Sequence, residues 1–241
     1  MGNNIKYVIA ALPRSGTKYI STVLTKLGLN CSHELYFNCN TCKFSDDQKD
    51  SAFGDSSWMS VPYIDKLPPG TVVFHQLRDP IKVLNSNMPP DGDSYFRIWD
   101  STGLLSDPLY KTHPWKRFIW KSTQNWVWPD GGGNVPHSKE EIQRLIHWWE
   151  NWNLWVEFSA TKRFDITYVR YRIEDLSPEL LEQIYYLIKD EKEQSTTVKE
   201  RCVETLSEVS TILNRHREPN TYIVPDMLPA SARLLMYKYG Y

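Results

Sequence analysis

The sequence predicts an α/β domain in which a mainly parallel sheet is flanked by helices. Three short runs of β-branched and aromatic residues, each bounded by turn or charged residues, have the character of buried strands: 5–12, 71–77 and 165–171. Between them the apolar residues follow a helical period, most clearly over 139–160. Strands that alternate with helices favour right-handed crossovers and parallel pairing. The length of 241 residues suits one such domain, 1–241.

The predicted helix at 139–160 has a recognisable start, because Ser138 is followed three residues later by Glu141, the spacing of a capping box. Its apolar residues recur at three- and four-residue steps: Ile142, Leu145, Ile146, Trp149, Trp152 and Val156. Ligands of parallel sheets bind beyond the carboxyl ends of the strands. Functional residues are therefore expected directly after the strands at 5–12 and 71–77.

Charge and the first residues limit the classes of partner. Twenty-eight Lys and Arg against twenty-nine Asp and Glu give a formal net charge of −1, so no global field favours nucleic acid or an anionic membrane. The apolar stretch near the N-terminus covers about seven residues, too few for a signal peptide or a membrane span. We therefore expect a cytoplasmic protein whose four cysteines are reduced thiols.

The segment 12–28, LPRSGTKYISTVLTKLG, continues the first predicted strand as a small-residue turn and then an amphipathic helix. Residues 15–17 would point backbone N–H groups at the mouth of that helix. Unpaired N–H groups and the helix dipole both favour an anion there. Arg14 and Lys18 add positive charge to the same place. An ordinary strand-to-helix turn with two surface cations is the alternative interpretation.

This loop differs from the nucleoside-triphosphate motif G-x-x-x-x-G-K-[ST], which would need Gly at Ala11 and Lys at Thr17. It resembles instead the 5′-phosphosulfate loop of the sulfotransferase superfamily, P-[KR]-S-G-T-[TS], with Lys18 at the last position. The resemblance is closest to tyrosylprotein and bacterial sulfotransferases, which carry Arg where Arg14 stands. It implies a P-loop-like sheet and the sulfonate donor 3′-phosphoadenosine 5′-phosphosulfate.

Roles for the loop residues follow from this resemblance by position. Ser15, Gly16 and Thr17 would cradle the 5′-phosphate of the donor. Arg14 would lie near the bridging oxygen and the transferring sulfonate. An ammonium at Lys18 is compatible with the same phosphate.

A second anion site is predicted where the strand at 71–77 ends. Asp79 is a natural N-cap and Pro80 a natural first helical residue, so a helix begins directly after Arg78. Ser86 lies roughly 9 Å along that helix, at about 1.5 Å of rise per residue. The pattern resembles the sulfotransferase motif R-[DN]-P-x5-S, and this resemblance implies that Arg78 and Ser86 hold the 3′-phosphate.

Sulfonate transfer also needs a base within hydrogen-bond reach of the acceptor. His33 and Glu34, in the segment GLNCSHELYF, are both candidates. Glu34 stands twenty residues after Arg14, which resembles the placement of a catalytic Glu in tyrosylprotein and some bacterial sulfotransferases. We expect Glu34 to be the base and keep His33 as the alternative. A solvated carboxylate at Glu34 would leave the role to another residue, with His113 the first to test.

Three further features allow narrower expectations. Ile173 stands where many sulfotransferases have an adenine-contacting Tyr, so no adenine contact is assigned. The Trp-rich segment 95–128 could line an acceptor pocket or belong to the core. Zinc-ligand residue types cluster near the first helix, but buried or idle thiols are the preferred interpretation and no metal is predicted. These residues are Cys31, His33, Cys39 and Cys42.

The resemblance as a whole implies a sulfotransferase that moves a sulfonate group to a hydroxyl or amine and releases 3′,5′-adenosine bisphosphate. Its expected acceptor is a small molecule or a glycan, with no nucleic acid or membrane partner. Neither the acceptor nor the oligomeric state can be read from the sequence. Two alternatives stay open: a P-loop kinase using ATP and Mg²⁺, and a non-catalytic protein that binds adenosine bisphosphate.

Overall fold

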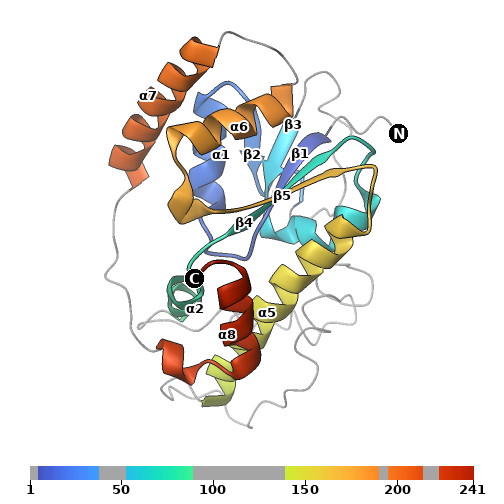
Figure 1. Ribbon diagram of the computed structural model, residues 1–241, viewed down its shortest axis with the longest axis vertical. Coiled ribbons are helices and arrows are strands. Elements are labelled where there is room, and N and C mark those ends of the chain that lie inside the picture. The colour runs from blue at the N-terminus through green and yellow to red at the C-terminus, as the bar shows by residue number, and fades with distance from the viewer. Residues whose placement is uncertain (1–4, 38–52, 89–138, 190–194, 214–222) are drawn as a thin grey trace. The chain divides into compact units, whose positions relative to one another are not determined.

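The computed structural model describes residues 5–37, 53–88, 139–189, 195–213 and 223–241 (Figure 1). The chain divides into two compact units. The first combines Met1–Arg78 with Val156–Arg217, and the second combines Asp79–Trp155 with Glu218–Tyr241. Each unit is described by itself, and the single domain 1–241 stays a prediction.

A sheet of parallel strands forms the centre of the first unit (Figure 1). Its described strands are β1 (Ile5–Ala10), β2 (Cys31–His33), β3 (Phe53–Ser56), β4 (Val72–Leu77) and β5 (Thr167–Arg172). Their order in the sheet is β2-β3-β1-β4-β5, so β1 pairs with β3 on one side and with β4 on the other. The predicted class, α/β with a mainly parallel sheet flanked by helices, is confirmed.

Three helices gather on one side of this sheet in Figure 1: α1 (Thr17–Lys26), α6 (Pro178–Lys189) and α7 (Ser195–Leu213). Their apolar faces and alternate strand residues form one buried core, because side chains of a strand point to its two faces in turn. Members of this core include Tyr7, Ile9, Ile20, Leu24, Phe74, Tyr171, Ile184 and Val198.

The remaining described elements are 3₁₀ segments, two helices of the second unit, and the long helix α5 (Lys139–Thr161), which belongs to the second unit up to Trp155 and to the first from Val156. The 3₁₀ segments are η1 (Trp58–Lys66), η3 (Ile173–Asp175) and η4 (Pro225–Met227). The two helices of the second unit are α2 (Pro80–Ser86) and α8 (Ala230–Lys238). None of the helices within the described ranges is both long enough and apolar enough to cross a membrane.

The predicted elements agree with the structure to within a few residues, and two strands were not predicted. The three predicted strands correspond to β1, β4 and β5, and the long helix ends at Thr161. Asp79 caps α2 as expected, since its Oδ1 accepts from the N–H groups of Ile81 and Lys82 at 2.9 and 3.3 Å. Ser138, Cys39, Cys42, His113 and the segment 95–128 lie outside the described residues.

The short strand β3 depends on a close approach between Gly54 and Tyr7 of β1. The Tyr7 ring crosses over Gly54 so that its hydroxyl donates to the Leu29 carbonyl at 2.8 Å. A Cβ atom on Gly54 would lie 1.9 Å from Tyr7 Cζ, far inside van der Waals contact. Glycine at 54 therefore leaves room for the Tyr7 ring, whose hydrogen bond to Leu29 connects β1 with the turn before β2.

We expect Gly54→Ala to lower the free energy of unfolding by about 1–3 kcal/mol through overpacking, and by about 1 kcal/mol more if the Tyr7 hydrogen bond is lost. Urea unfolding of the variant measures this loss. In a Tyr7→Leu background, which lacks the outer ring atoms, the same change should cost much less. Equal costs in the two backgrounds would show that the ring is not the obstacle.

Candidate functional site

The candidate site lies at the carboxyl edge of the sheet, within the first unit. Because β1 pairs in parallel with β3 and β4, the residues that follow these strands meet at one edge. These are the loop 11–16, the residues after Ser56, and Gln76–Arg78. The chain leaves β1 toward β2 on one side, while β4 lies on the other side, which makes this edge a topological switch point.

The loop between β1 and α1 contains a tight turn followed by the helix N-terminus. The Ser15 N–H donates to the Leu12 carbonyl at 3.1 Å. The expectation that this N–H points at the helix mouth is therefore wrong. Gly16 has φ 86° and Ile20 N–H donates to its carbonyl at 3.0 Å, so the N–H groups of residues 16–19 precede any intrahelical acceptor. This end of the helix retains the donors that an anion site needs.

A buried glutamine of the neighbouring strand β4 holds the loop between β1 and α1 in place. Gln76 of β4 is fully buried, and its Nε2 donates to the Ser15 carbonyl at 2.6 Å. Its Oε1 accepts from the Tyr171 hydroxyl of β5. This chain of hydrogen bonds connects three parts of the unit and satisfies a buried amide. The sequence carried a signal for it, namely a Gln inside the otherwise apolar run TVVFHQL.

The two arginines predicted for separate phosphates are connected through the backbone. Arg78 Nη1 donates to the Arg14 carbonyl at 2.6 Å. Arg14 itself has φ 69°, the left-handed conformation that non-glycine residues rarely adopt. The half-buried side chain of Arg78 therefore reaches the backbone from which the exposed side chain of Arg14 extends. Ser86 ends α2 in the second unit, and its pairing with Arg78 stays a prediction.

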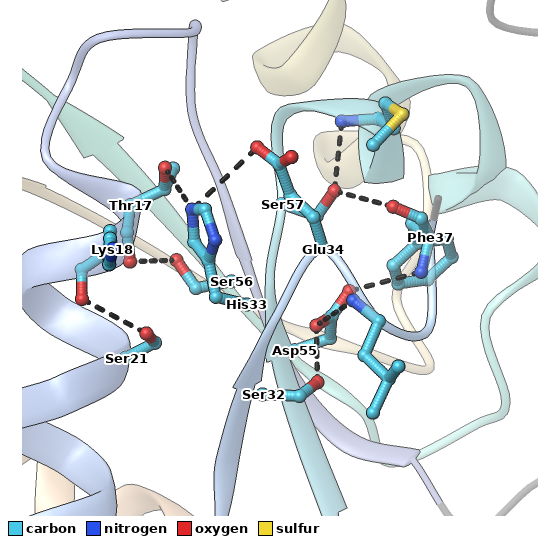
Figure 2. Close-up of polar contacts among 12 residues, drawn as sticks. Thr17, Lys18, Ser21, Ser32, His33, Glu34, Phe37, Asp55, Ser56 and Ser57 are labelled. Atoms are coloured by element: carbon cyan, nitrogen blue, oxygen red, sulfur yellow. Dashed lines mark hydrogen bonds and ion pairs between the residues drawn. The ribbon is translucent and has the colours of Figure 1, made fainter. Parts of the chain in front are cut away.

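The two candidate bases lie next to the start of α1 (Figure 2). His33 Nε2 lies 3.0 Å from the Thr17 hydroxyl and 3.7 Å from Glu34 Oε1, so the imidazole stands between them. His33 ends β2, and Glu34 follows it with φ 54°, in the left-handed region like Arg14 and Asn30. The structure therefore brings His33 and Glu34 to the N-terminal end of α1.

Burial shifts the two candidate bases in opposite directions. Desolvation, followed by the charge of Asp55, raises the pKa of Glu34 above its ordinary value. Desolvation, followed by the charge of Lys18, lowers the pKa of His33 below its ordinary value. Near neutral pH this leaves a neutral imidazole beside a carboxylate that is more basic than usual.

Asp55 is a feature of this region that sequence reasoning missed. It lies in β3 and is fully buried. Its Oδ1 accepts from the Ser32 hydroxyl and from Leu35 N–H, and its Oδ2 accepts from Phe37 N–H at 3.1 Å (Figure 2). The available signal was a lone acidic residue in the small-residue run GDSS, directly after Phe53, because a buried carboxylate requires partners.

The described cysteines are free thiols. Cys31 is buried, and its pKa is raised to about 12, first of all by burial. No group of three or more His, Cys, Asp or Glu side chains suited to a metal occurs in the described part of the chain.

No protein-family model matches the chain, and no curated protein matches it either. The candidate site therefore stands on its own geometry and on the sequence motifs.

The lowered pKa of His33 predicts how stability depends on pH. The unfolded chain takes up the imidazole proton near its ordinary pKa of 6.5, while the folded state resists it until lower pH. This contribution to the free energy of unfolding is complete above pH 6.5 and is lost as the pH falls through the folded pKa. Glu34, with its raised pKa, contributes with the opposite sign, and this part remains in a His33 variant.

In the variant His33→Gln, the free energy of unfolding should therefore fall less between about pH 7.5 and about pH 5.5 than it does in the wild-type protein. Urea unfolding at the two pH values measures this difference for the wild-type protein and the variant. A variant that keeps the whole wild-type loss would mean that His33 titrates alike in the folded and unfolded states.

Proposed function

We propose that this protein is a sulfotransferase that uses 3′-phosphoadenosine 5′-phosphosulfate as donor and a hydroxyl or amine as acceptor. The observation that carries the proposal is the meeting of three groups at one sheet edge. These are the helix N-terminus after Gly16, the Arg14–Arg78 connection, and the Glu34 carboxylate beside His33, whose imidazole contacts Thr17. The motifs at 12–18 and 78–86 supply the donor class.

The loop and the two arginines would bind the donor. The N–H groups of residues 16–19 and the Thr17 hydroxyl suit the 5′-phosphate, since free N–H groups and the helix dipole favour negative charge. Arg14 and Lys18 would stabilise charge on the sulfonate and the leaving phosphate. Arg78 would bind the 3′-phosphate. Charge-assisted contacts of this kind are the strongest hydrogen bonds available to a protein.

Glu34 would remove the acceptor's proton. As the acceptor oxygen or nitrogen attacks sulfur, its proton passes to the Glu34 carboxylate and the bond from sulfur to the phosphate oxygen breaks. The bisphosphate then leaves with the electron pair of that bond. A raised pKa makes Glu34 a better base than an exposed carboxylate. His33 is the alternative base, because its imidazole is neutral near pH 7 and reaches the same place.

Two features weigh against the kinase alternative. In nucleoside-triphosphate loops the Ser or Thr directly after the motif's Lys binds Mg²⁺, whereas here Lys18 occupies that position. Asp55, the carboxylate on the strand next to the loop, is fully buried and accepts three hydrogen bonds. Neither group is presented as a ligand for Mg²⁺ carried by ATP.

Nucleotide binding tests the donor class. We expect 3′,5′-adenosine bisphosphate to raise the melting temperature, with stabilisation of about 2.7 kcal/mol at roughly a hundredfold excess over Kd. ATP with Mg²⁺ should stabilise much less, because it carries no 3′-phosphate for Arg78. Thermal-shift titration of both ligands is the measurement, and an equal or larger shift with ATP would favour the kinase.

The variant Arg78→Ala sharpens this test. Loss of a charge-assisted contact of about 1.5–3 kcal/mol corresponds to a fall in bisphosphate affinity of about tenfold to a hundredfold. Lys26→Ala is the matched control, since Lys26 is a cation of α1 at the end away from the loop, paired with Glu208 at 2.6 Å. Unchanged affinity in folded Arg78→Ala protein would remove this residue from the site.

A further inference from the structure

The buried carboxylate of Asp55 has no role in the proposed reaction so far, yet it organises the segment that carries Glu34. Its two oxygens accept from Ser32, Leu35 and Phe37, on both sides of Glu34. The Glu34 N–H donates to the Ser56 carbonyl, next to Asp55 in β3, at 3.2 Å. The turn at 34–37 is therefore built onto the end of β3.

Asp55 explains how Glu34 can hold its unusual backbone conformation. A non-glycine residue in the left-handed region costs about 1–3 kcal/mol, and it persists only where its surroundings impose it. Glu34 has φ 54°. The hydrogen bonds from Leu35 and Phe37 to Asp55 supply that constraint directly after Glu34.

A carboxylate is needed here, and an amide of the same size would not serve. Both oxygens of Asp55 face donors, so an asparagine would place its own NH₂ group against either Phe37 N–H or the Ser32 and Leu35 donors. One donor at least would lose its acceptor in a fully buried place.

We propose that Asp55 is a positioning residue for Glu34: the buried carboxylate of Asp55 holds the turn 34–37 so that the Glu34 carboxylate lies beside His33. The catalytic consequence rests on the proposed function, while the positioning itself can be measured without any turnover.

The electrostatic surroundings agree with this role. The groups that face Glu34 in the described chain are His33 of β2, Asp55 of β3 and the Trp58 indole of η1, which donates a hydrogen bond to it. The pKa of the neighbouring His33 is lowered by burial and then by the positive charge of Lys18 of α1. Burial, and after it the negative charge of Asp55, raises the pKa of Glu34, so Asp55 adds to the basicity of Glu34 as well as fixing its place.

The test is the titration of the Glu34 side-chain carboxyl by carbon NMR in the wild-type protein and in Asp55→Asn. We expect the pKa of Glu34 to fall in the variant, because a negative charge is removed and the turn loosens. Asp165→Asn is the matched control, since Asp165 pairs with Arg163 at the opposite, amino end of β5, and it should leave Glu34 unchanged. An unchanged Glu34 titration in folded Asp55→Asn protein overturns the proposal.

The wild-type protein offers a second measurement that needs no variant. The amide proton shifts of Leu35 and Phe37 should titrate together with Asp55, at a pKa above the ordinary value of 3.8, because both N–H groups donate to its carboxylate. Amide shifts that do not follow Asp55 overturn the proposal.

Turnover separates this proposal from the proposed function. If sulfonate transfer occurs, Asp55→Asn should lower kcat by about tenfold to a hundredfold through misplacement of the base. The acidic limb of the pH profile of kcat should move to lower pH in Asp55→Asn, and the KM for the donor should stay unchanged. If Asp55→Asn alters the Glu34 titration but neither the wild-type protein nor any variant transfers sulfonate, the positioning role of Asp55 is supported and the proposed sulfotransferase activity is contradicted.

Discussion

The parallel register of β1 between β3 and β4 is the constraint on which the rest of the site depends. Val8 pairs with Asp55 on one side and with Val73 on the other, so the carboxyl ends of three strands lie side by side. Each strand then delivers one part of the site: the loop 12–17, the residues Asp55 and Ser56, and the pair Gln76 and Arg78. The close passage of the Tyr7 ring over Gly54 shows how tightly this arrangement is packed.

Two buried polar side chains transmit this register to the loops. Gln76 fixes the Ser15 carbonyl, and Asp55 fixes the turn that carries Glu34. Each is fully buried, and both polar atoms of its amide or carboxylate group have hydrogen-bond partners. Buried polar groups are stable in a protein under this condition. In both places the held residue adjoins or occupies a left-handed backbone position, at Arg14 and at Glu34. Strain of this kind tends to gather at functional sites.

Much of the framework could be predicted from the sequence, because it depends on local patterns. Apolar runs and turn residues predicted β1, β4 and the long helix, and Asp79–Pro80 predicted the start of α2. The strand β3 could not be predicted in this way, since FGDS has little strand propensity and is held by its pairing with β1. The contact between Thr17 and His33 depends on that same register. Sequence spacing suggested His33 and Glu34 as candidates, but not the role of Asp55.

Transfer of radiolabelled sulfonate tests the central claim most directly. The protein is incubated with labelled 3′-phosphoadenosine 5′-phosphosulfate and pools of alcohols, phenols, amines and glycans, beside Glu34→Gln and His33→Ala. We expect a labelled product with the wild-type protein and a rate lower by about a hundredfold to ten-thousandfold in Glu34→Gln, with bisphosphate binding retained. If His33→Ala abolishes transfer while Glu34→Gln keeps more than about a tenth of it, the base is His33. Binding of bisphosphate without a labelled product in any pool would contradict the enzyme and leave a nucleotide-binding protein.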